Sequence, residues 1–127
     1  MALFRVFLAI ASLLGGLGVA AGAFASHALR DQLTERMLAV FETGVRYQMY
    51  HALALGGVAL LLARSEVGSG WLTAAGWAFI AGVMIFSGSL YALSLSSVKW
   101  LGAVTPLGGV ALIAGWGCLA IAALVGK

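Results

Sequence analysis

The sequence contains very little charge. Of its 127 residues, 7 are Lys or Arg and 4 are Asp or Glu, so that 9% of the chain is charged and 63% is hydrophobic. A soluble domain carries about 25% charged residues, and a chain of this length folded in water could not cover so much apolar surface. The composition therefore excludes an ordinary soluble domain and predicts a single integral membrane domain over residues 1–127.

Cysteine and proline each occur once in the chain, as Cys118 and Pro106. A single cysteine cannot form an internal disulfide, and we expect Cys118 to be a small, buried apolar side chain. The scarcity of proline and the 18 glycines are typical of membrane helices that pack closely. Runs of basic residues are also missing, so the sequence predicts no nucleic-acid partner.

Long apolar stretches dominate the sequence instead. Four of them approach the roughly 20 residues that a helix needs to cross a bilayer. They cover about residues 4–26, 45–63, 71–93 and 102–125. Ala25 and Ser26 imitate a secretory cleavage site, but the first stretch is long and interrupted by glycine, so we interpret it as a true span. The predicted fold is all-α: a membrane-embedded, antiparallel four-helix bundle, multi-pass in the cell (inner) membrane.

Charge is concentrated in one polar segment, residues 30–46, which contains six of the 11 charged residues (7 basic plus 4 acidic). Its apolar residues recur at helical spacing, at Leu33, Met37, Val40 and Phe41. This pattern predicts a short amphipathic helix at the membrane interface, over about residues 31–44, between the first and second spans. Asp31 or Thr34 could cap its start. The helix could also run on into the second span, with Gly44 as a bend.

The candidate functional site lies around this segment. Glu42 and Arg46 are four residues apart, a spacing that predicts an ion pair clasping the interfacial helix to the second span. Tyr47, Tyr50 and His51 follow on less than half of the helix circumference, and His27 ends the first span on the same side of the membrane. The candidate polar cluster comprises His27, Glu42, Arg46, Tyr47, Tyr50 and His51.

The two histidines allow several interpretations. Together with Glu42 they could bind a metal ion, and the two alone could ligate haem. Diagnostic spacings such as HExxH and CxxCH are absent from the sequence, so we predict no metal and no cofactor. His51 could instead take part in a proton path. The simplest interpretation is that each histidine hydrogen-bonds to a tyrosine or to a carbonyl at a helix end.

Small residues form stripes at three- or four-residue spacing along three of the spans. Such stripes predict close helix contacts, either inside one bundle, at the seam of a homo-oligomer or at a docking face for a larger membrane complex. The residues concerned are Gly15, Gly18 and Gly22 in the first span, Ala78 and Gly82 in the third, and Gly115 in the fourth. In the fourth span Thr105 precedes Pro106, which predicts a helix start or a fixed bend; a transport hinge is the alternative.

Two sequence blocks point to a known family. Residues 22–29 read GAFASHAL and residues 41–54 read FETGVRYQMYHALA. Together with the blocks at 87–91 and 101–109, they make the whole chain resemble the YgdD-like small membrane proteins, a family of multi-spanning membrane proteins without an established biochemical activity. The resemblance implies four transmembrane helices and includes both histidines, but it implies no substrate and no reaction.

Motifs of soluble-type catalysis are missing: the sequence has no nucleophile elbow, phosphate loop or pair of carboxylates in a plausible pocket. We therefore expect that the protein is not an enzyme. Three functions stay open. The first is a non-enzymatic accessory or assembly partner of a larger membrane complex. The second is a small transporter or channel for a proton, an ion or a small molecule, and the third is a metal- or haem-binding protein that uses His27 and His51.

Overall fold

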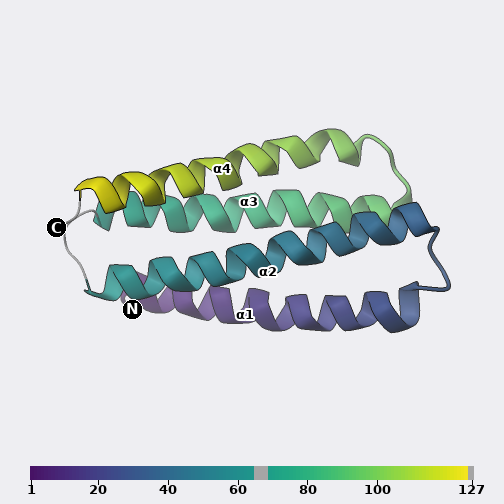
Figure 1. The fold of residues 1–127 in the computed structure, drawn as a ribbon, viewed down its shortest axis with the longest axis horizontal. Coiled ribbons are helices and arrows are strands. Elements are labelled where there is room, and N and C mark those ends of the chain that lie inside the picture. Colours follow the sequence, from purple (N-terminus) through teal and green to yellow (C-terminus); the bar gives the residue numbers. More distant parts are fainter. Residues whose placement is uncertain (65–68, 126–127) are drawn as a thin grey trace.

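The computed structural model describes residues 1–64 and 69–125, and in these ranges its regular structure is entirely helical. The elements are α1 (Leu3–Phe24), a short π-helical segment η1 (Ala25–Leu29), α2 (Glu35–Arg64), α3 (Ser69–Ser96) and α4 (Leu101–Val125). Consecutive α-helices run in opposite directions, so that the start of α1 and the end of α4 lie at the same end of the molecule (Figure 1). The all-α, antiparallel expectation is confirmed for the described residues.

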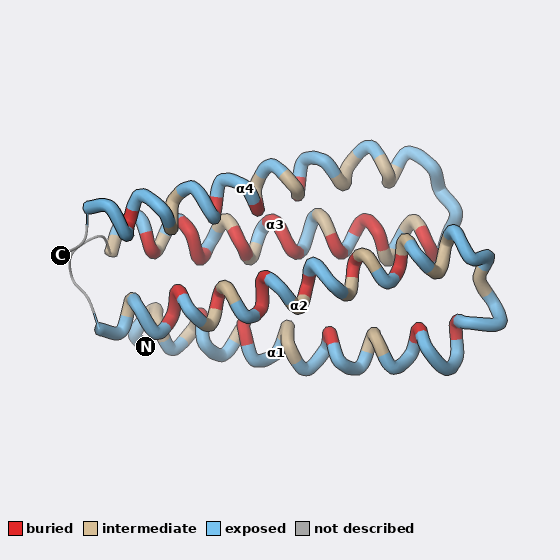
Figure 2. The backbone as a smooth tube through the Cα atoms, viewed as in Figure 1, coloured by how far each residue is buried: buried red, intermediate tan, exposed pale blue. Residues whose placement is uncertain are grey.

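The core is shared by all four α-helices. Each helix packs mainly on its neighbour in sequence, and α3 and α4 have the most extensive contact. Phe7 of α1, Leu55 of α2, Phe79 of α3 and Leu112 of α4 belong to one buried apolar cluster. Figure 2 shows that buried residues follow α2 and α3 along most of their length, whereas α1 and α4 are exposed along most of theirs. The two inner helices are therefore the ones that can bury polar side chains.

Glycine allows α3 and α4 to approach closely. A Cβ added at Gly108 would lie 2.8 Å from the Cα of Phe86, and one added at Gly82 would lie 2.7 Å from Leu112 Cγ. Gly115 makes room in the same way for the ring of Phe79. Atoms cannot approach this closely without a shift, so these glycines set the distance between the two helices.

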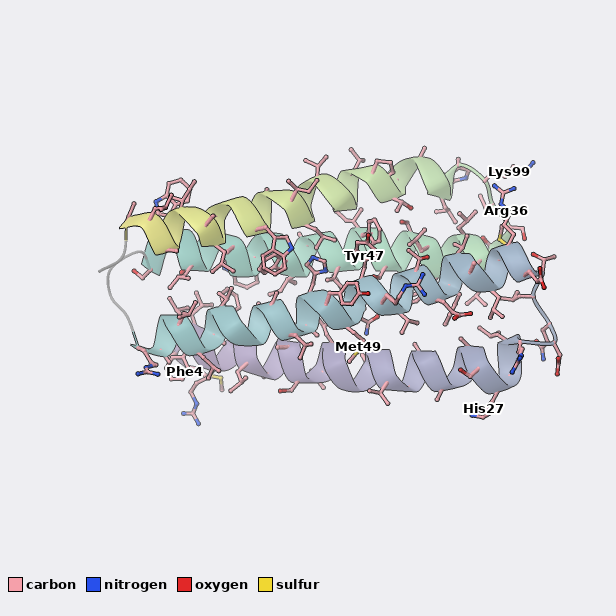
Figure 3. All side chains as sticks on the ribbon, viewed as in Figure 1. Phe4, His27, Arg36, Tyr47, Met49 and Lys99 are labelled. Carbon is pink, nitrogen blue, oxygen red and sulfur yellow. The ribbon has the colours of Figure 1, made fainter. Side chains whose placement is uncertain are left out.

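The other small residues of the predicted stripes differ in how closely they pack against a neighbouring helix. Gly18 of α1 is buried against the side chain of Met49, which projects from α2 toward α1 (Figure 3). A Cβ added at Gly22 would be in ordinary contact with Val45 Cγ1 at 3.5 Å, whereas one added at Gly15 would meet nothing within 4 Å. Ala78 of α3 is partly buried. Of the first-span glycines, Gly18 therefore makes the closest helix contact.

The helix over residues 35–44 is continuous with the predicted second span. A separate interfacial helix over 31–44 is not present, because α2 begins at Glu35 and passes through Gly44 without a break. Gly44 is a packing position: an added Cβ would lie 2.8 Å from Tyr91 Cε1. The cap is Thr34, whose Oγ1 accepts a hydrogen bond from the Met37 amide at 3.2 Å.

Three helical stretches of the described residues are long and apolar enough to cross a membrane, namely Leu3–Leu29, Ser69–Ser96 and Leu101–Val125. α2 is not among them, since charged residues occupy its first turns and polar residues its middle.

The helix α4 starts five residues before Pro106 and continues through it, so the proline does not mark the start of the helix. Thr105 Oγ1 lies 2.6 Å from Ser89 Oγ, which joins α4 to α3 at this point.

Candidate functional site

The polar residues in the middle of α2 face the inside of the bundle. Gly44, Gln48, His51, Leu55 and Val58 are all buried, and they follow one another at intervals of three or four residues. This spacing places them on one face of the helix. Gln48 and His51 are therefore part of the same stripe that forms the apolar core further along α2.

Gln48 joins three helices. Its side chain is only 5% exposed, and its Nε2 donates a hydrogen bond to the carbonyl oxygen of Leu14 in α1 at 2.8 Å. Its Oε1 accepts a hydrogen bond from the Tyr91 hydroxyl of α3 at 2.6 Å. One turn away, Ser87 Oγ donates to the Gly44 carbonyl oxygen at 2.7 Å. These bonds connect α1, α2 and α3 and satisfy the buried polar atoms within the protein.

His51 is also 5% exposed, and both of its ring nitrogens are engaged. Nδ1 lies 2.7 Å from the carbonyl oxygen of Tyr47, one turn earlier in α2. On the other side of the ring, Trp116 Nε1 of α4 donates a hydrogen bond to Nε2 at 3.1 Å. Because an indole N–H only donates, Nε2 must accept, and the proton of the neutral ring lies on Nδ1 and is donated to Tyr47. The arrangement fits the hydrogen-bonded interpretation of His51, with a mid-helix carbonyl as the partner.

Aromatic rings surround His51. Its ring centroid lies 5.6 Å from that of Phe79 and 5.8 Å from that of Trp116. Tyr47 extends this group toward α3, with its ring 4.6 Å from that of Phe86. Such edge and offset contacts are the favourable arrangements of aromatic pairs. They fix the position of the imidazole between α2, α3 and α4.

A groove lies beside this aromatic group, between α2 and α4. We call it the α2–α4 groove; it has a volume of about 490 Å³ and is lined by Tyr47, Tyr50, His51, Phe86, Gly109 and Trp116 together with apolar side chains of α4. Charged residues do not contribute to its lining. Tyr47 is 38% and Tyr50 54% exposed.

The two histidines are not brought together. His27 lies in η1 and is exposed, and Figure 3 shows it on the outer side of α1, away from the other helices. His51 is buried among α2, α3 and α4. Within residues 1–64 and 69–125, no group of three or more His, Cys, Asp or Glu side chains could hold a metal ion. The proposed two-histidine site therefore has no geometric basis in this part of the chain.

The predicted ion pair between Glu42 and Arg46 is wrong. Both side chains are exposed, and Arg46 Nη2 donates instead to Thr43 Oγ1 at 3.1 Å. The spacing of four residues allows an ion pair but does not require it, because a nearer hydroxyl competes for the same donor.

Cys118 is half-buried and packs against the main apolar cluster.

Sequence reasoning missed three residues of the site, namely Gln48, Tyr91 and Trp116. Gln48 could have been found, because it is an uncharged polar residue on the same helical face as His51 and three residues before it. Trp116 could not, since its pairing with His51 joins positions 65 residues apart. Periodicity identifies a buried face, but it does not identify the partner on another helix.

The chain belongs to a family with the description "Protein of unknown function (DUF423)", whose family model matches residues 21–109. It is 45% identical to the UPF0382 membrane protein YwdK of Bacillus subtilis (strain 168) over 120 residues, which cover 94% of this chain and 97% of that protein. A UPF0382 membrane protein of Staphylococcus epidermidis (strain ATCC 12228 / FDA PCI 1200) is 41% identical over 120 residues, covering 94% and 96%. No solved structure matches the chain. The chain is thus a membrane protein of this family.

Proposed function

We propose that this DUF423 member is a non-enzymatic, four-span protein of the cell inner membrane that acts as an assembly partner of a larger membrane complex. The observation that carries the assembly role is an outer groove of small residues where α1 meets α2. This α1–α2 groove has a volume of about 540 Å³, and Ser12, Gly15, Gly56 and Gly57 contribute to its lining. Small residues let the backbone of a further transmembrane helix approach closely.

The interior polar groups support a structural role. Among the described residues, no buried side-chain nitrogen or oxygen lacks a hydrogen-bond partner. Gln48 and His51 use their polar atoms to join neighbouring helices. Groups that are already paired in this way favour a structural role over transport through the bundle. The transporter alternative therefore has less support, and so does metal or haem binding, because His27 and His51 lie apart.

The length and burial pattern of α2 support its role as the fourth span. Its 30 residues extend over about 45 Å, whereas the hydrocarbon core is about 30 Å thick. The excess can place the charged first turns, with Glu35 and Arg36, outside the hydrocarbon and residues 45–63 inside it. Leu53 and Leu60, both exposed and both lining the α1–α2 groove, would then face the hydrocarbon or a helix seated in that groove. We also propose that the chain is one of the YgdD-like proteins, on the basis of the sequence blocks at residues 22–29 and 41–54.

The assembly role is tested by native electrophoresis of membranes solubilised in a mild detergent. We expect the tagged chain from native membranes to migrate in a heavier species than the purified chain. Gly57→Leu fills the α1–α2 groove without meeting another atom at its Cβ, and we expect it to abolish this species. Gly117→Leu, at an equally open position of α4, is the matched control and should preserve it.

Co-purification with a second, differently tagged copy of the chain distinguishes a homo-oligomer from a complex with other proteins. Recovery of that copy as the sole companion would show self-association instead of assembly with others. Identical migration of the native and purified chains as a monomer would refute the assembly role. So would a heavier species that Gly57→Leu leaves intact.

A further inference from the structure

We propose that the α2–α4 groove binds an acyl chain of an anionic phospholipid, and that Arg46 binds the phosphate of its head group. The inference rests on the part of the proposed function that places α2 across the membrane, and it is independent of the assembly role. It joins three observations: the apolar lining of the groove, the position of Arg46 at one end of it, and the two lining tyrosines, Tyr47 and Tyr50, that follow Arg46 on α2.

The groove has the chemistry of a site for hydrocarbon. Its lining contains aromatic and aliphatic side chains and no charged ones, and its polar ring nitrogens, those of His51 and Trp116, already bond to partners. Gly109 keeps the α4 side of the groove open, because the nearest atoms to an added Cβ are those of Phe86 at 3.8 and 3.9 Å. A chain entering from the bilayer would therefore displace no internal hydrogen bond.

Arg46 directly precedes Tyr47, the first residue of α2 that lines the groove. It precedes Tyr50 by four residues, so the two occupy the same side of α2. With residues 45–63 as the span, Arg46 is its second residue and lies at the membrane boundary. Its side chain is exposed, and its guanidinium bonds to the neutral Thr43 hydroxyl and not to the exposed Glu42. A guanidinium at this level retains donors that can bind a phosphate in a forked geometry.

Tyr47 and Tyr50 add two hydroxyl donors on the helical turn that follows Arg46. Neither makes a hydrogen bond to another residue of the described chain, whereas the Tyr91 hydroxyl does. Helical side chains lean toward the start of their helix, which for α2 is the end that carries Arg36 and Lys99 (Figure 3). Two uncharged donors and one cation are therefore carried by residues 46–50 of α2, at the boundary end of an apolar groove. The complementary ligand is an amphiphile with an anionic, acceptor-rich head.

The test uses the purified full chain in nanodiscs that contain equal amounts of phosphatidylglycerol and phosphatidylcholine. The lipids that remain bound after transfer to detergent are quantified by mass spectrometry. We expect about fivefold enrichment of phosphatidylglycerol, since a basic residue near the membrane surface contributes about that factor. Arg46→Gln should remove the enrichment and retain lipid, whereas Gly109→Leu should reduce retention of both lipids. Gly57→Leu, in the other groove, is the matched control and should behave as the wild type.

Several outcomes would overturn the inference. Equal retention of the two lipids by the wild type, or enrichment that survives Arg46→Gln, would exclude the role of Arg46. Unchanged retention in Gly109→Leu would exclude the groove as the chain site. Displacement of bound lipid by glycerol phosphate alone would show that the head group binds without the chain. Because Arg46 is exposed, Arg46→Gln preserves the fold and provides a result even if Gly109→Leu does not fold.

Discussion

Gly108→Leu is expected to separate α3 from α4 and to destabilise the bundle by more than the roughly 1–3 kcal/mol typical of an overpacked core. At this position the obstacle is backbone, since an added Cβ would lie 2.8 Å from Phe86 Cα and closer still to the backbone nitrogen of Phe86. A side chain can rotate away from a clash, but the helix axis must move to relieve this one. The measurement is the loss of helical circular dichroism as SDS is added to the protein in mild detergent.

The matched control for Gly108 is Gly117→Leu, on the same helix. An added Cβ at Gly117 meets nothing within 4 Å, so this variant should unfold at the SDS fraction of the wild type. Equal unfolding midpoints for the two leucine variants would contradict the close approach of α3 and α4. Both substitutions replace glycine by leucine within a helix, so the difference between them isolates packing from helix propensity.

Gln48→Leu is expected to lower the free energy of unfolding by about 1–3 kcal/mol. The substitution removes the hydrogen bond to the Leu14 carbonyl and leaves the half-buried Tyr91 hydroxyl without its acceptor. Tyr91→Phe should cost less, because it removes the hydroxyl along with the bond. Tyr50→Phe is the matched control, since the Tyr50 hydroxyl is exposed and makes no hydrogen bond within the described residues; it should leave stability unchanged.

The direct contact between Gln48 and Tyr91 is measured by a double-mutant cycle in the same SDS titration. We expect a coupling energy of about 0.6 kcal/mol, within the range found for hydrogen bonds between membrane helices. Additive effects of Gln48→Leu and Tyr91→Phe would contradict the bond between α2 and α3. A large effect of Tyr50→Phe would show that the titration reports a general loss of aromatic hydroxyls instead.

Several features of the fold follow directly from the sequence. The positions of four helices are readable from apolar stretches, because a helix that crosses a bilayer must be apolar over most of its length. Thr34 is recognisable as a cap because its hydroxyl precedes the first turn of α2. The charged segment is also readable, and it lies at the end of the molecule where Figure 3 shows Arg36 and Lys99.

The site is less predictable than the helices, for two physical reasons. Hydropathy averages over all faces of a helix, so α2 is less apolar than the three clear span candidates although Gln48 and His51 point inward and are paired. Spacing within a helix states which side chains can meet but not which bond forms, as Arg46 shows by bonding to Thr43 and not to Glu42. The Trp116–His51 bond depends on how two distant helices pack, which single-sequence periodicity does not contain.

The central claim is that α2 crosses the membrane with its polar residues turned inward, and cysteine labelling tests it most directly. In a Cys118→Ser background, single cysteines replace Ala2, Asp31, Leu53, Val98 or Val125, and intact vesicles are treated with a membrane-impermeant maleimide. The account predicts that positions 2 and 125 react from one side, that 31 and 98 react from the other, and that 53 does not react. Labelling of positions 2 and 125 from opposite sides, or reaction of position 53, would contradict it.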